Sequence, residues 1–389
     1  MLRGGTPWGH GSAADVVVRD GRIHDLVAPG DGTAEQTIDV GGCLLLPGLV
    51  EAHCHLDKTL LGLPWTPHTA GDALADRIRH DRVRRTELGL PRPDGVRALL
   101  TLMSEAGTTQ VRTHTDVDPE VGLRGIEVVA EVARELADRI TVQQVAFPQH
   151  GLLTAPGTAE LLDEALRSGA DVVGGLDPGG LDGDPVRHLD TVFGLAERHH
   201  AGVDLHLHDG GSLGLWELDL ICERTRALDL GGRVTVSHAY ALGAAAPDLQ
   251  AAAAERLAEA GVAVVTCAVY DFPVAPLRIL AAAGATVGCG HDGIRDLWGP
   301  YGSGDMLDRA MHLAYRNTLR RDEDIELALH AATDGGAAVL GLGDHGLRPG
   351  APADVVAVPA STAAEAVVVH PPRRLVLKGG RVVVDREGS

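Results

Sequence analysis

The chain has 389 residues, 44% of them hydrophobic, and a formal net charge of −20. The length predicts more than one folding unit, and the charge argues against binding to nucleic-acid phosphates or to anionic membrane surfaces. The five scattered cysteines form no CxxC pair, and the sequence shows neither a signal peptide nor a long apolar run. We therefore expect a cytoplasmic protein with free thiols and no membrane segment.

Both ends of the chain are expected to form short strands. The segment ADVVVRDGRIHDLV, residues 14–27, has two apolar runs around Asp-Gly, which is a β-hairpin signal. Near the C-terminus, ADVVAVPA and RRLVLKGGRVVVDRE have the same character. Residues 1–45 and 344–389 are therefore predicted to form one small β-sandwich domain built from both termini.

The middle of the chain, residues 46–343, alternates short apolar runs with amphipathic helical patterns. The predicted strands are 43–53, 109–117, 140–147, 170–176, 202–208, 233–239, 261–268 and 285–292. Helical patterns lie between them, for example at 125–139 and 158–169. Eight strands alternating with helices predict an α/β fold of the (β/α)8 TIM-barrel type. A doubly wound sheet would give a similar pattern, but it would usually carry a Gly-rich loop after its first strand, and that loop is missing.

Histidines and aspartates gather where the predicted strands end. They are His53, His55, His114, Asp116, His206, His208, Asp209, His238, His291 and Asp292, and Gln149 follows the third strand. In a TIM barrel these ends form the active site. Because residues i and i+2 of a strand share a face, His53 and His55 can both point into the barrel mouth. Together with His206 and Asp292 they offer three imidazoles and a carboxylate, a set suited to one Zn²⁺ or Fe²⁺.

At this point the sequence resembles the amidohydrolase superfamily, within it the branch of bacterial cytosine deaminase and the N-isopropylammelide amidohydrolases. The segments that carry the resemblance are PGLVEAHCHLDKT, VRTHTDV, QVAFPQHG, EALRSGADVVGG, RVTVSHA, GHDGIRDLWGPYGSGDML and KGGRVVV. The resemblance implies a deaminase-type hydrolase that attacks a C–N bond of a small cyclic amidine or amino-heterocycle, cytosine-like or triazine-like, with hydroxide derived from a metal-bound water.

The number of metal ions follows from the lysines. Many relatives bridge two metals with a lysine at the end of the fourth strand, which here reads VVGGLDPGG. The two lysines of the chain, Lys58 and Lys378, lie elsewhere, so we expect one divalent metal ion.

The resemblance also implies roles for single residues. His53, His55, His206 and Asp292 bind the metal, and Asp292 also takes the proton of the metal-bound water. His238 orients and polarises the attacked carbon or its oxyanion. Two further residues are expected in the substrate pocket: Gln149 hydrogen-bonds the substrate edge, and Trp298 forms a wall.

Two positions depart from the cytosine deaminase pattern and put cytosine itself in doubt. Asp209 stands where those enzymes have a glutamate, and Gly293 stands where they have a second aspartate. Asp209 is expected to transfer protons, with His208 as an alternative helper that contacts the substrate. His114 either contacts the substrate, lies behind the metal or is a structural core histidine.

Other charged residues are expected to be peripheral. Lys58 and Arg295, near the mouth, either favour an anionic substrate or are solvated. The remaining histidines that were considered, His150, His188, His199 and His200, are expected at the surface.

Two other functions stay open. The chain could be an amidohydrolase that cleaves a cyclic or N-substituted amide, or a catalytically silent relative that binds a small molecule. The complete set of predicted ligands argues against the silent relative. The expected partner is a small-molecule substrate, with no nucleic acid and no membrane, and a homo-oligomer is left open.

Overall fold

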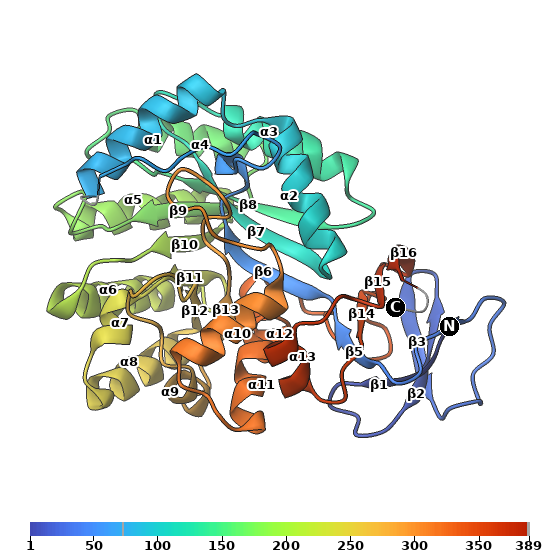
Figure 1. Cartoon of the computed structure of the whole chain (residues 1–389). Helices are drawn as coiled ribbons and strands as arrows, with labels where there is room; N and C mark the ends of the chain where they lie inside the picture. The colour runs from blue at the N-terminus through green and yellow to red at the C-terminus, as the bar shows by residue number, and fades with distance from the viewer. Residues whose placement is uncertain (72–73, 387–389) are drawn as a thin grey trace.

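Eight parallel strands form the barrel, in the sequential order β6 to β13. The computed structural model describes residues 1–71 and 74–386 and shows this barrel surrounded by helices (Figure 1). The strands are β6 (Leu49–Cys54), β7 (Thr108–Asp116), β8 (Thr141–Phe147), β9 (Val172–Leu176), β10 (Gly202–His206), β11 (Val234–Ser237), β12 (Val262–Thr266) and β13 (Val287–Cys289). Each of them overlaps one predicted strand, so the predicted TIM-type barrel is confirmed.

The helices cover the outside of the barrel with one apolar face each. They are α1 (Leu74–Leu88), α2 (Pro93–Glu105), α3 (Arg124–Glu135), α4 (Thr158–Arg167), α5 (Pro185–His199), α6 (Gly211–Ala227), α7 (Tyr240–Ala244), α8 (Pro247–Ala260), α9 (Leu277–Ala282), α10 (Met306–Arg316), α11 (Asp322–Ala331), α12 (Asp334–Val339) and α13 (Ala363–Val369). In α3 the buried Ile126, Val129 and Val132 recur every three residues and form such a face. Within the described residues, no helix is long and apolar enough to cross a membrane.

The first and last barrel strands meet at one point, next to the histidine pair of β6. Cys54 and Asp292 form an isolated parallel bridge, and the amide of Asp292 donates to the carbonyl of His53 at 2.9 Å. Gly290 makes this approach possible, because a Cβ at this position would overlap the backbone of His53. The barrel therefore closes where the candidate ligands sit.

A second eight-stranded sheet is built from both ends of the chain, as predicted (Figure 1). Its order is β16-β15-β14-β5-β1-β2-β3, and β4 pairs with β1. The strands are β1 (Leu2–Pro7), β2 (Ala14–Arg19), β3 (Arg22–Val27), β4 (Ile38–Asp39), β5 (Leu44–Pro47), β14 (Val355–Val358), β15 (Leu375–Lys378) and β16 (Arg381–Asp385). A core that includes Leu2, Val16, Leu45 and Leu377 lies within this domain.

The predicted strand 43–53 is wrong in one respect, because the chain changes sheets within it. β5 pairs with β14 of the small sheet, whereas β6 pairs with β7 of the barrel. The break falls at Gly48, where a Cβ would overlap the side chain of Thr109. The continuous apolar run concealed this break, since both strands are buried. The domain boundaries 1–45, 46–343 and 344–389 remain a prediction.

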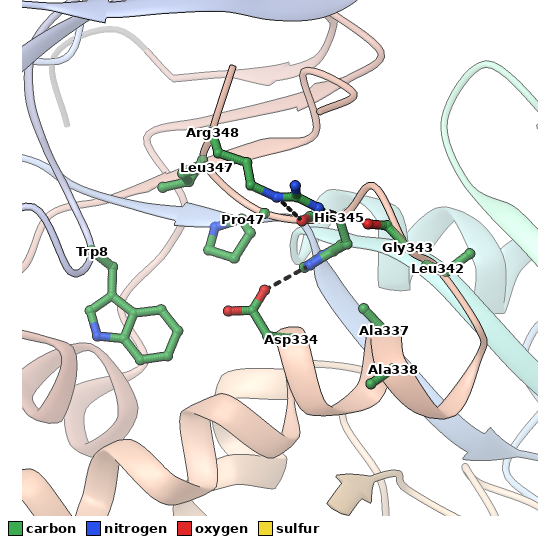
Figure 2. Close-up of a pocket in the computed structure, with 11 residues that line it drawn as sticks. Trp8, Pro47, Asp334, Ala337, Ala338, Leu342, Gly343, His345, Leu347 and Arg348 are labelled. Carbon is green, nitrogen blue, oxygen red and sulfur yellow. Dashed lines mark hydrogen bonds and ion pairs between the residues drawn. The ribbon is translucent and has the colours of Figure 1, made fainter. Parts of the chain in front are cut away.

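The junction between the two domains contains a cavity of about 370 Å³, which shares no lining residue with the cavity at the histidine cluster (Figure 2). One wall is His345, whose Nδ1 lies 2.9 Å from Asp334 Oδ1 and whose Nε2 lies 2.9 Å from the carbonyl oxygen of Gly48. Trp8 and Pro47 line the side of the small domain. His345 thus ties the start of the C-terminal segment to the point where the chain changes sheets.

The barrel interior contains a buried ion pair. Arg112 of β7 donates to Asp204 Oδ2 of β10 at 2.9 Å, and the two residues are 4% and 0% exposed. The same guanidinium donates to Thr235 Oγ1 at 3.1 Å, to the carbonyl of Val339 at 2.8 Å and to Gln143 Oε1 at 2.7 Å. Because every one of these partners is an acceptor, the charge of Arg112 is well compensated.

We predict that Arg112→Met lowers the free energy of unfolding by about 3–5 kcal/mol, because it leaves a buried aspartate unpaired. The measurement is equilibrium denaturation in urea. As a control, Arg256→Met breaks the exposed ion pair with Asp219 and should cost less than about 1 kcal/mol. Arg112→Met/Asp204→Leu should recover part of the loss. A loss for Arg112→Met no larger than that of the control would contradict this account.

Candidate metal centre

The two histidines of β6 are held with their Nε2 atoms free. His53 Nδ1 lies 2.9 Å from Ser237 Oγ, and this hydroxyl donates to Asp204 Oδ1 at 2.7 Å. The Ser237 oxygen therefore accepts the Nδ1 proton of His53. His55 Nδ1 lies 2.8 Å from the carbonyl of His114, which can only accept. Both rings thus carry their proton on Nδ1 and offer the lone pair of Nε2, the form that binds a metal.

Three side chains at the carboxyl ends of other strands converge with His53 of this pair. One ligand atom each of His53, His206, His238 and Asp292 lies within 4.8 Å of every other. His55 is not in this set, but its Nε2 lies 3.2 Å from Asp292 Oδ1, while His53 Nε2 lies 3.6 Å from the same oxygen. The sequence-predicted residues His53, His55, His206, His238 and Asp292 are therefore brought together.

The ring nitrogens of this cluster are buried without partners. His53 Nε2 and both nitrogens of His206 and of His238 have no hydrogen-bond partner among the residues that the structure describes. A buried polar atom without a partner lowers the stability of the folded state unless a hydrogen bond or a bound ion compensates it. A divalent cation would satisfy them, so the residues present fit a metal ion.

The charge states also suit a metal. Burial, followed by neighbouring histidines, holds the pKa values of His206 and His238 well below the usual range, so both rings are neutral. Burial raises the pKa of Asp292, but the close approach of His53 and His55 outweighs burial and brings the net pKa well below its usual range. Neutral imidazoles and an ionised carboxylate are the ligand forms that metal binding requires.

Two of these residues have unusual backbone conformations. His238 has φ +70° and Asp292 has φ +66°, in the left-handed region that non-glycine residues rarely adopt. His238 follows directly on β11, and Asp292 lies three residues beyond the end of β13. The turn aims the side chain across the barrel mouth, and such strain is typical of functional positions.

His114 lies below the cluster. Its ring is fully buried, with its centroid 4.0 Å from that of His53, and its Nε2 lies 3.6 Å from Asp204 Oδ2. His53, His114 and Asp204 form a second group with metal-ligand spacing. The Asp204 oxygens already accept from Arg112 and Ser237, so Asp204 is better described as a support for the cluster. Both ring nitrogens of His114 are buried without a hydrogen-bond partner among the described residues. A substrate contact by His114 remains a prediction.

The cluster opens into a large cavity of about 1600 Å³. Besides His55, His206 and Asp292 of the cluster, four predicted site residues line it: Gln149, Trp298, His208 and Asp209. His208 is the nearest of them to the cluster, with its ring centroid 4.4 Å from that of His238. Its Nδ1 lies 3.0 Å from Asp177 Oδ2. Burial lowers the pKa of His208, but the bond to Asp177 outweighs it and the net pKa is raised.

Asp209 lines this cavity and accepts hydrogen bonds from two backbone amides. Its Oδ2 accepts from Gly180 N at 2.8 Å and from Gly179 N at 3.2 Å. Glu217 of α6 accepts from the same Gly179 amide at 2.8 Å. Burial, together with the charge of Asp209, raises the pKa of Glu217 to about 8. The catalytic role of Asp209 remains a prediction.

The structure corrects two expectations about peripheral residues. Lys58 was expected near the mouth, either solvated or favouring an anionic substrate; it lines the cavity, but it is 6% exposed and forms an ion pair with Asp116 at 2.9 Å, so the solvated alternative is wrong. His188 was expected at the surface, but it is fully buried against Asp182, with Nδ1 2.6 Å from Oδ2. Arg295 is exposed, as expected.

Sequence reasoning missed the residues that support the ligands, namely Arg112, Asp204 and Ser237. A signal was present, because Asp204 and Arg112 each stand two positions before a strand-end histidine and so share its inward face. Polar residues at inward positions of otherwise apolar strands indicate a buried network.

We predict that Ser237→Ala weakens metal binding about 10- to 100-fold, because His53 loses the acceptor that fixes its Nδ1 proton. Competition with a chromogenic chelator measures the affinity. Ser168→Ala, remote from the cluster at the end of α4, serves as the control. An unchanged metal affinity in Ser237→Ala would show that the hydrogen-bond chain from Asp204 through Ser237 to His53 does not affect metal binding.

We predict a pH-dependent stability difference between Glu217→Gln and the wild type. Since the pKa of Glu217 is raised in the folded state, folding stabilises the protonated form, and stability is lost as the pH rises from about 4.5 through about 8. The glutamine cannot ionise, so the variant should gain stability relative to the wild type over this window and level off above it. Urea denaturation at pH 5, 7 and 9 is the measurement. Glu223→Gln, exposed on the same helix, should follow the wild type. Parallel pH profiles of Glu217→Gln and the wild type would contradict the prediction.

Comparison with known proteins agrees with this geometry. N-isopropylammelide isopropyl amidohydrolase of Pseudomonas sp. (strain ADP) is 33% identical over 384 residues, with 97% of this chain and 94% of the relative covered. The crystal structure of N-isopropylammelide isopropylaminohydrolase from Burkholderia multivorans superposes with a TM-score of 0.93 at 46% identity, covering 98% and 97% of the two chains.

A deaminase structure is also similar. The 5-methylcytosine deaminase from Klebsiella pneumoniae, liganded with 5-fluorocytosine, gives a TM-score of 0.87 at 28% identity, covering 100% of this chain and 98% of the other. The model of the amidohydrolase family matches residues 36–384. The chain therefore belongs to the amidohydrolase family, in the branch that contains these triazine and cytosine enzymes, and is an enzyme that acts on C–N bonds other than peptide bonds.

Proposed function

We propose that this enzyme is a hydrolase with one divalent metal ion, zinc or iron, that removes an amino group from a small amino-heterocycle. The observation that carries the proposal is the set of unpartnered ring nitrogens of His53 and His206 that converge with Asp292 at the carboxyl ends of the barrel strands. The absence of a lysine from β9 supports a single ion rather than a bridged pair.

The proposed ligands are His53, His55, His206 and Asp292. A divalent cation bound there lowers the pKa of a coordinated water to about 7. The ionised carboxylate of Asp292 is then the group that accepts a proton. His238, neutral and 1% exposed, belongs to the same cluster, and its proposed role is to polarise the attacked carbon by hydrogen-bonding the oxyanion that forms on it.

The leaving amine needs a proton, and His208 is the proposed donor. It lines the cavity next to His238, and Asp177 favours its protonated form. Asp209 is the alternative donor, although backbone amides already occupy its Oδ2.

The proposed substrate is a nitrogen ring that carries an amino or alkylamino group. Two relatives are named for N-isopropylammelide and one for 5-methylcytosine, which supports both ring types. The cavity has room beyond a single ring, and Tyr240 and Phe272, which stack at 5.2 Å, line it. This apolar surface favours the alkylamino substituent. We also propose a cytoplasmic location, and we leave assembly into a homo-oligomer as a prediction.

We predict that the wild type contains about one zinc or iron ion per chain and releases ammonia or an alkylamine from members of a ring panel. The panel comprises cytosine, 5-methylcytosine, ammeline and N-isopropylammelide, and two cyclic amides test the alternative of amide cleavage. His206→Ala should lose both the metal and turnover. His24→Ala, on an exposed strand position, should keep both.

The outcomes separate the three functions. Amine release from the aminated rings supports the proposal. Turnover of the cyclic amides without amine release supports the amide hydrolase, and metal binding without any turnover supports a silent binder. Full metal content and activity in His206→Ala would contradict the site itself.

A further inference from the structure

The substrate cavity has a buried cation that the proposed reaction does not use. Lys58 lies at the end of the short 3₁₀ turn Leu56–Lys58 that follows β6, and it lines the cavity. It is 6% exposed, although lysine is rarely buried unless it is paired. Its Nζ lies 2.9 Å from Asp116 Oδ1 and 2.5 Å from Gln149 Oε1.

The ion pair keeps this lysine charged. Burial lowers the pKa of Lys58, but Asp116 and then Asp57 outweigh it, so the net pKa is raised. Asp116 is in turn 3.4 Å from Arg85 Nη1 of α1. Phe147 covers another side, with its ring centroid 5.5 Å from the Lys58 Nζ. The ammonium is thus fixed from three directions.

A charged lysine can only donate hydrogen bonds. The atom of Gln149 that faces it must therefore be the amide oxygen, because the amino group of the amide would place donor against donor. No acceptor among the described residues takes a hydrogen bond from Gln149 Nε2, and the side chain lines the cavity.

We propose that Lys58 is a positioning residue that fixes Gln149 as a hydrogen-bond donor, so that the site selects rings with an acceptor at the edge that meets Gln149. The selected class is an amino-heterocycle with a carbonyl oxygen there, rather than one with a second amino group. This inference rests on the proposed function, because it concerns the substrate of that cavity. A ring with an amino group at this edge would place donor against donor and lose a buried hydrogen bond.

The test uses two matched pairs of rings. Cytosine and 2,4-diaminopyrimidine differ in one substituent, an oxo against an amino group, and ammeline and melamine differ in the same way. Dissociation constants from calorimetry and kcat/KM from amine release are measured for each. We expect the wild type to prefer the oxo member by about tenfold or more in the pair that binds, which is the effect of one buried hydrogen bond.

Four variants separate positioning from a structural role. Lys58→Met removes the ammonium and lets the amide of Gln149 rotate, so the ratio of affinities for the oxo and the amino ring should fall towards 1. Lys58→Arg keeps a charged donor and should retain the preference for the oxo ring. Gln149→Leu should abolish the preference, and Lys58→Met/Gln149→Leu should match Gln149→Leu alone, since Lys58 acts through Gln149. Metal content and a thermal melt verify folding.

A further variant covers the case in which Lys58→Met does not fold. Gln149→Glu keeps an oxygen acceptor for Lys58 but removes the amide donor, so it should fold and lose the preference for the oxo ring. Failure of every ring to bind the metal-loaded wild type would contradict the proposed function, and this inference with it. Binding of a pair with equal affinity, an unchanged preference in Lys58→Met, or additive losses in the double variant would overturn this inference alone.

Discussion

The ion pair between Arg112 and Asp204 is the constraint on which the rest of the site depends. It joins β7 to β10 across the barrel interior, where side chains are sealed from water. A buried charge must be compensated, so the geometry of this pair is tightly determined. Asp204 then accepts from Ser237, and Ser237 fixes His53. The tautomer of the candidate ligand His53 is thus set, through Ser237, by the ion pair of Asp204 with Arg112.

Barrel closure and ligand placement use the same atoms. The amide of Asp292 pairs with the carbonyl of His53, so the last strand is joined to the first by two candidate ligands. Their side chains approach one another because their backbones do. This pairing holds Asp292 in its left-handed conformation, with φ +66°, at the point where the barrel closes. It also means that loss of metal and loosening of the barrel seam are expected to be linked.

The elements predicted from the sequence are those that depend on local pattern. The eight barrel strands and the terminal sheet followed from apolar runs and turn residues, and the HxH pair followed from the period of a strand. Contacts across the sheet could not be predicted in this way. The switch of sheets at Gly48, the burial of Lys58 and the pairing of His188 with Asp182 depend on which side chains meet in three dimensions. Asp292 and His206 were found because strand ends converge in any barrel.

In the segment HLHDGG, residues 206–211, Asp209 and the neighbouring His208 have different hydrogen-bond partners. Asp209 replaces the glutamate of the cytosine deaminases, but its carboxylate accepts from the Gly179 and Gly180 amides and so stabilises the loop after β9. Glu217 retains a proton beside it, away from the metal cluster. His208, by contrast, is held by Asp177 in a form that favours protonation, and its ring packs against that of His238. Under the proposed function, the proton donor is therefore His208, one residue before Asp209 in the same loop.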